Sequence, residues 1–157
     1  MTNAICMVGR PKAAHIAQGL SDYARRLKAW GGCELIAVKS VRAGKATPAS
    51  EVMAKEGQGL LARLEGRDVV WALDRKGRGW SSEEWARELA RIRDQGTRRL
   101  VLVIGGALGL SPEVLRRSDA RVSLGPATLA HELAALVAAE QLYRAYTILA
   151  GLPYHRA

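Results

Sequence analysis

Three glycines follow a strand-like run of five apolar residues at positions 100–104. They are Gly105, Gly106 and Gly109. Glycine adopts positive φ readily and lets a ligand approach the bare backbone. In α/β proteins, cofactors bind where a strand ends in such a turn ahead of a helix. The pattern therefore predicts a cofactor site, and the alternative is a tight turn that holds no ligand.

Two other predicted strands end in residues that suit the same site. Leu73 and Asp74 end one apolar run, and residues 124–129 follow another. Because parallel strands place their carboxyl ends on one side of a sheet, the three loops are expected to line one pocket. Taken singly, Asp74 is also a common turn residue and Pro126 a common helix breaker.

Near the end of the chain, Glu140 and Arg144 stand four residues apart, in the order that favours an ion pair on a helix. Most such pairs are solvated and weak. Tyr154, His155 and Arg156 then place three functional side chains on a short tail. The tail is expected either to fray, as termini commonly do, or to be held over a pocket.

Several catalytic classes lack their motifs here. The sequence contains no GxxxxGK[ST], GxSxG or HExxH, and the first strand is not followed by GxGxxG. The histidines His15, His131 and His155 have no ligand-like spacing, so no metal site is predicted. Cys6 and Cys33 fit neither a redox nor a zinc motif.

The periodicity of apolar residues predicts strands that alternate with helices. Strands are expected at 4–8, 33–38, 68–73, 100–104 and 121–124. Helices are expected over about 17 residues after residue 12, and at 50–64, 81–96, 112–117 and 130–150. Residues 39–50 are expected to form a mobile basic loop, and residues 74–80 a second loop. The alternation indicates one α/β domain, spanning residues 1–157, on a mostly parallel sheet.

The formal charge of +9 and the pI near 10.2 favour a polyanionic partner such as nucleic acid, although a basic protein can also be merely soluble. No apolar run is long enough for a membrane span, and the start does not fit a signal peptide. A cytoplasmic location and no membrane association are expected.

Several blocks together carry a resemblance to a known family. They include Lys55-Glu56-Gly57, Ile104-Gly105-Gly106 with Gly109-Leu110, the run 140–145 with His131 before it, and Tyr154-His155-Arg156. With these blocks the chain resembles the SPOUT superfamily of methyltransferases over almost its whole length. It is most similar to the RlmH type, which methylates N3 of a pseudouridine in large-subunit ribosomal RNA.

The resemblance implies a C-terminal trefoil knot, a homodimer and S-adenosyl-L-methionine as cofactor, with no metal. Knots are nearly absent among protein topologies, so periodicity does not predict one. By the motif match, the cofactor pocket is expected to be lined by Leu73, Gly105, Leu124, Gly125, Pro126, Ala127, Thr128 and Leu129.

The implied substrate is 23S rRNA, at helix 69, within the assembled 70S ribosome. The resemblance makes His155 a general base or an orienter of the uracil edge, and Arg144 and Arg156 stabilisers of an anionic base or a phosphate. Glu140 would orient Arg144, and Tyr154 would stack on the base or hydrogen-bond to it.

Three positions depart from the family pattern. Ala107 and Ala130 stand where proline is common, and Ala135 stands where arginine is common. The alternatives are a ribosome-binding protein that keeps the fold without catalysis, and a SPOUT methyltransferase that acts on another RNA. Phosphate contacts are expected from Arg10, Lys12, Arg42 and Lys45.

Overall fold

The protein, described here from a computed structural model, is built on one five-stranded sheet. The structure describes residues 1–42, 44 and 46–155. The strands are β1 (Thr2–Val8), β2 (Cys33–Val38), β3 (Val69–Gly79), β4 (Arg99–Ile104) and β5 (Ala120–Ser123). Their order is β2-β1-β4-β3-β5, and each neighbouring pair is parallel. The predicted α/β class and the parallel sheet are confirmed.

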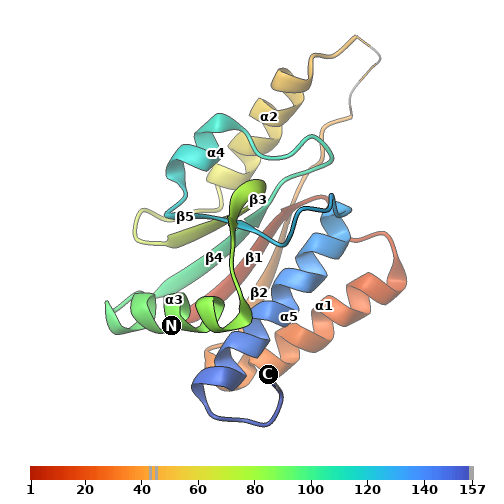
Figure 1. The fold of residues 1–157 in the computed structure, drawn as a ribbon. Helices are drawn as coiled ribbons and strands as arrows, with labels where there is room; N and C mark the ends of the chain where they lie inside the picture. Colours follow the sequence, from red (N-terminus) through yellow and green to blue (C-terminus); the bar gives the residue numbers. More distant parts are fainter. Residues whose placement is uncertain (43, 45, 156–157) are drawn as a thin grey trace.

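Helices cover both faces of the sheet (Figure 1). They are α1 (Ala14–Arg26), which runs into a short 3₁₀ turn (Leu27–Trp30), α2 (Ala49–Leu61), α3 (Ser82–Asp94), α4 (Pro112–Arg117) and α5 (His131–Leu149). Helices α2 and α4 pack on one face, and α1, α3 and α5 pack on the other. The chain therefore forms three layers, with the sheet in the middle.

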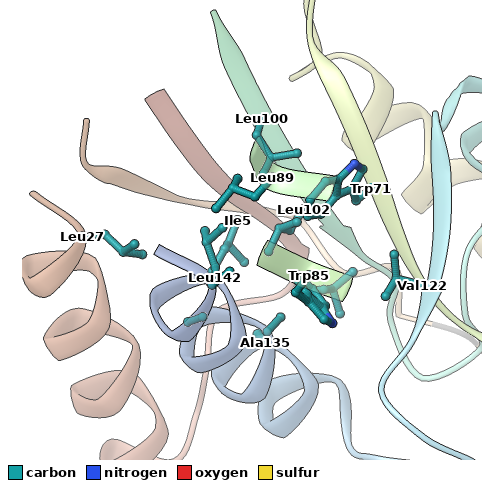
Figure 2. Packing of buried hydrophobic residues seen from close by; sticks show 14 of the residues in the cluster. Ile5, Leu27, Trp71, Trp85, Leu89, Leu100, Leu102, Val122, Ala135 and Leu142 are labelled. Atoms are coloured by element: carbon teal, nitrogen blue, oxygen red, sulfur yellow. The ribbon is translucent and has the colours of Figure 1, made fainter. Parts of the chain in front are cut away.

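The central strand β4 is buried on both of its faces. Leu100 and Leu102 point toward α3 and α5, while Val101 and Val103 join the core under α2 and α4. Figure 2 shows the larger of these two cores, where Leu142 of α5 and Trp85 of α3 lie beside the sheet. Burial on both faces explains the continuous apolar run, because a strand with one solvated face would alternate with polar residues.

Two helices start with a serine cap. Ser81 accepts the Glu84 N–H and the Glu84 carboxylate accepts the Ser81 N–H at 2.8 Å, so α3 begins with a capping box. Ser111 caps α4, with Pro112 in its first turn. These caps fix the points at which the chain leaves β3 and β4 for the next helix.

The prediction of a loop at residues 74–80 is wrong, because β3 continues to Gly79. Leu73 pairs with Val122 of β5, the register shifts across residues 74–77, and Arg78 and Gly79 then pair with Val122 and Ser123. The part of β3 beyond Leu73, called the arm below, is polar, and this suits a strand here because most of its side chains are exposed. The exposed residues are Arg75, Lys76, Arg78 and Gly79. Sequence polarity alone does not separate such a strand from a loop.

No helix in the part of the chain that the structure describes is long and apolar enough to cross a membrane.

Burial predicts that two leucines contribute very differently to the free energy of unfolding. Leu89 of α3 is 0% exposed, and Leu35 on the edge strand β2 is 43% exposed. We expect Leu89→Ala to lower the free energy of unfolding by about 2–5 kcal/mol, since it leaves a cavity in the core. The matched substitution Leu35→Ala should cost less than about 1 kcal/mol. Urea denaturation measures both, and equal losses would contradict this account of the core.

Candidate functional site

Residues 73–76 within β3 and the segments that follow β4 and β5 line one cavity of about 560 Å³. Of the residues predicted to bind a cofactor, the structure places seven on its wall: Leu73, Gly105, Leu124, Gly125, Ala127, Thr128 and Leu129. Pro126 does not line it. The size falls within the range of small-molecule sites, which is about 300–1,000 Å³.

The glycine turn after β4 needs glycine for two different reasons. At Gly105 a Cβ would collide with the backbone of Gly109, because the turn folds back on itself. Gly109 itself has a φ of +88°, whereas Gly105 and Gly106 do not have positive φ. The sequence reasoning identified the right residues, but close approach of the backbone, rather than positive φ, explains Gly105.

A buried carboxylate, that of Glu56, packs against this turn. Glu56 of α2 is 6% exposed, and its Oε1 accepts the Val41 N–H at 3.0 Å. A Cβ on Gly106 would come within 2.7 Å of the other Glu56 oxygen. Glu56 therefore joins the glycine turn to the segment that follows β2. Residues 55–57 belong to the sequence pattern that resembles the family, but the pattern alone predicts no role for Glu56.

The first turn of α5 connects the cavity to the segment after β1. His131 lines the cavity, and its Nε2 lies 3.9 Å from where a Cβ on Gly9 would be. The neighbouring Glu132 accepts the N–H groups of Lys12 and Ala13 at 3.0 and 3.4 Å. Glu132 thereby holds the two residues that precede α1 against the start of α5. These hydrogen bonds lower the pKa of Glu132.

The predicted pair on α5 is formed and collects further donors. Glu140 Oε1 accepts Arg144 Nη2 at 2.6 Å, Arg144 Nε at 3.0 Å and the Tyr154 hydroxyl at 3.1 Å. The guanidinium of Arg144 also lies 4.8 Å from the centre of the Tyr154 ring. The hydroxyl of Tyr23 on α1 is 3.3 Å from that of Tyr154. The tail is thus docked on α5 and α1 as far as the structure describes it.

His155 bridges α5 and the start of α3. Its Nδ1 lies 3.4 Å from Arg144 Nη1, and its Nε2 lies 2.8 Å from Glu83 Oε1. A guanidinium only donates, so Nδ1 accepts and the neutral ring carries its proton on Nε2, which donates to Glu83. Both ring nitrogens are therefore occupied in this arrangement.

Glu83, Glu140, Arg144, Tyr154 and His155 form what is called the tail cluster below, and their contacts keep several of these groups in defined protonation states. The Ser81 hydroxyl, with help from the Glu83 N–H and His155, lowers the pKa of Glu83 to about 2. Burial, together with the contacts to Tyr23 and Glu140, raises the pKa of Tyr154, which therefore stays a neutral donor. Hydrogen bonding to Glu140 raises the pKa of Arg144. Near neutral pH, Glu83 is thus an anion and Arg144 a cation.

The cavity and the tail cluster lie at opposite ends of α5. His131 lines the cavity, whereas Glu140, Arg144, Tyr154 and His155 do not. At 1.5 Å per residue, the 13 positions from His131 to Arg144 span about 20 Å of helix. Within one chain the tail is therefore not held over the cavity.

Two predicted residues, Arg156 of the tail and Lys45 of the basic loop, lie outside the described residues. Among the residues that are described, no three His, Cys, Asp or Glu side chains gather in a way that could hold a metal ion.

Comparison with known proteins gives one family over nearly the whole chain. The family model described as "Predicted SPOUT methyltransferase" matches residues 1–155. A Limosilactobacillus fermentum protein named "Ribosomal RNA large subunit methyltransferase H" is 43% identical over 152 residues, which are 95% of this chain and 96% of the relative. A Pseudomonas paraeruginosa protein of the same name is 40% identical over 149 residues, again 95% and 96% of the two chains.

Solved structures show the same fold at low identity. A probable methyltransferase from Bordetella pertussis Tohama I superposes with a TM-score of 0.53 at 19% identity, covering 91% of this chain and 95% of that chain. A probable methylase family protein from Haemophilus influenzae Rd KW20 superposes with a TM-score of 0.54 at 14% identity, covering 99% of this chain and 70% of that chain.

The tail cluster predicts that Glu140 holds the tail in place. Glu140→Gln keeps the side-chain size but removes the charge that Arg144 and Tyr154 share. We expect it to lower the free energy of unfolding by about 1–3 kcal/mol and to speed amide exchange at residues 152–155. Glu88→Gln, which loses an exposed pair with Arg91, is the control and should cost less than about 1 kcal/mol. Unchanged exchange in the tail of the Glu140 variant would refute this role.

Proposed function

Because the chain belongs to the SPOUT methyltransferase family, we propose that it transfers a methyl group from S-adenosyl-L-methionine to N3 of a pseudouridine in helix 69 of 23S rRNA, within the assembled 70S ribosome. The observation that carries the proposal is the match over 95% of this chain to relatives named for large-subunit ribosomal RNA methylation. The family model extends to residue 155 and so includes Tyr154 and His155 of the tail.

The cavity residues fit S-adenosyl-L-methionine. A Cβ placed on Gly109 or Gly125 would meet no protein atom within 4 Å, so the backbone at these two wall positions is open to a ligand. Leu73, Leu124 and Leu129 supply apolar surface for the adenine ring. The exposed backbone of residues 105–109 and 124–129 supplies hydrogen bonds, so these residues would hold the cofactor.

The bound cofactor supplies an electrophilic methyl group, which moves by in-line displacement. The protein must then place N3 of the base in line with that methyl group, and positioning of this kind provides much of the acceleration. The proton on N3 has to leave, and His155 is the proposed base or orienter of the uracil edge. Arg144 and Arg156 would stabilise the anionic base or a phosphate, with Glu140 holding Arg144 in place. Tyr154 would stack on the base.

A reaction that needs both the cavity and the tail requires two copies of the chain. The two sites lie about 20 Å apart along the rigid helix α5. Leu133 and Leu149 on α5, and Leu152 after it, are exposed apolar side chains that a partner would cover. We therefore propose a homodimer in which the tail of one chain completes the cavity of the other. Docked on Glu83, His155 would exchange that contact for the substrate. Its Nε2–H would then donate to the uracil edge, and action as the base would require the ring proton to move to Nδ1.

Two further features belong to the proposal. Residues 1–157 would form a single domain, and the chain after β4 would form the C-terminal trefoil knot that the resemblance implies. The segments that such a knot would involve, residues 105–110 and 124–129, are those that line the cavity.

The direct test is transfer of a labelled methyl group from S-adenosyl-L-methionine to ribosomes that lack the modification. We expect incorporation at one position of the large-subunit RNA, and only when the target uridine has first been converted to pseudouridine. Binding of the cofactor, measured by calorimetry, is the parallel readout. Intact cofactor binding without methyl incorporation would favour a ribosome-binding protein without catalysis, and labelling of another RNA would favour a different substrate.

Mixing two inactive variants tests the shared site. Ala127→Trp fills the cavity, and His155→Ala removes the proposed base. Each variant alone should lose methyl transfer. Random assembly would make about half of the dimers mixed, each with one intact site, so the mixture should recover about a quarter of the wild-type activity. Failure to recover activity, although mixed dimers are present by native mass spectrometry, would place the tail and the cavity of one site on the same chain.

A further inference from the structure

The arm of β3 beyond Leu73 carries two cations at the cavity. Arg75 and Lys76 both line it, and both side chains are exposed. They lie between Leu73 and Arg78, where the register of β3 on β5 shifts. The methyl-transfer chemistry proposed above gives these two residues no part.

The arm is anchored, so its cations are held at the cavity rather than carried on a free loop. Asp74 Oδ1 accepts the Lys76 N–H at 3.1 Å, which closes a short turn. Gly77 packs so closely on the backbone of Arg121 and Val122 that a Cβ there would collide with it. Because the backbone is already ordered, a ligand that binds these cations loses less conformational entropy.

Neither cation is neutralised within the described part of the chain. Among the described residues, no carboxylate lies within 4.0 Å of the Arg75 guanidinium or the Lys76 ammonium, whereas Arg78 on the same arm pairs with Glu84 at 2.6 Å. Arg10 and Lys12, in the turn after β1, likewise have no ion pair among the described residues. Both of these side chains are exposed.

The two pairs of cations flank the glycine turn. Strand β4, which leads into this turn, lies between β1 and β3 in the sheet. Met7 of β1 and Leu73 of β3 both pair with Ile104 of β4, and adjacent strands are about 4.8 Å apart, so these two residues are separated by about 10 Å. The hydrogen bonds from Lys12 and Ala13 to Glu132 hold the β1 side against the start of α5, beside the cavity residue His131.

We propose that Arg75 and Lys76 bind the phosphate backbone of the RNA substrate on one side of the cavity mouth, while Arg10 and Lys12 bind it on the other. This inference rests on the proposed function. The RNA strand would cross the end of β4 from one pair to the other, and the target base between them would turn into the cavity. The single carboxylate of the cofactor does not account for cations on both sides of the cavity mouth, whereas a phosphodiester chain that crosses the mouth does.

The test compares Arg75→Gln/Lys76→Gln with a control of equal charge change, Lys55→Gln/Arg116→Gln, whose cations are paired with Glu51 and Glu113. Ribosome binding is measured by sedimentation between 50 and 200 mM salt, and methyl transfer at 150 mM. The salt slope is the slope of the logarithm of the binding constant against the logarithm of the salt concentration. Each lost phosphate contact makes this slope shallower by about 0.7–0.9, so the slope of the arm variant should be shallower by about 1.5. Its fall in affinity over this range would then be about eight-fold smaller than that of the wild type.

We expect the KM for ribosomes to rise on the order of ten-fold in the arm variant, with kcat and the Kd for S-adenosyl-L-methionine unchanged. A salt slope and KM equal to those of the control would overturn the inference. A weaker Kd for S-adenosyl-L-methionine with unchanged ribosome binding would also overturn it, because the cations would then hold the carboxylate of the cofactor. Ribosome binding does not require turnover, so the slope still tests the arm if the wild type transfers no methyl group to ribosomes.

Discussion

The length and rigidity of α5 determine how the rest of the molecule can work. The helix starts with a residue on the cavity wall, His131, and its second half carries Glu140 and Arg144, which hold the tail. A continuous helix does not bend back on itself, so the two chemical centres of one chain stay apart. In the homodimer proposed above, an active site that uses both centres would be shared, and each subunit would provide one half of two identical sites.

The cavity depends on two close approaches of the backbone. The turn after β4 folds onto itself at Gly105, and the arm of β3 packs onto β5 at Gly77. Neither position leaves room for a side chain. Glu56 then fixes the first of these turns to the segment after β2. These two close approaches shape the cavity, and side chains such as Leu73, Leu124 and His131 complete its wall.

The caps at Ser81 and Ser111 follow from local sequence, a serine with glutamate three residues on or with proline next to it. The order of strands and helices, and the meeting of the segments after residues 72, 104 and 123, were predictable from apolar periodicity and from parallel strands sharing one edge. The strand at residues 74–79 was not, since its polar side chains face solvent and its pairing with β5 is long-range. The roles of Glu56 and Glu132 were also missed. Each carboxylate receives backbone N–H groups from a segment distant in the sequence, and no local pattern encodes such a contact.

The three tryptophans next to the β3 arm give the protein an internal optical probe. Trp71, Trp80 and Trp85 pack edge to face, with ring centres 4.9–5.6 Å apart. Trp80 directly follows the end of β3, while Trp71 and Trp85 are fixed in the core. A shift of the arm would move one indole against two stationary ones. With the fourth tryptophan, Trp30 of the 3₁₀ turn, replaced by another aromatic residue, tryptophan emission would report on the part of the molecule that borders the cavity.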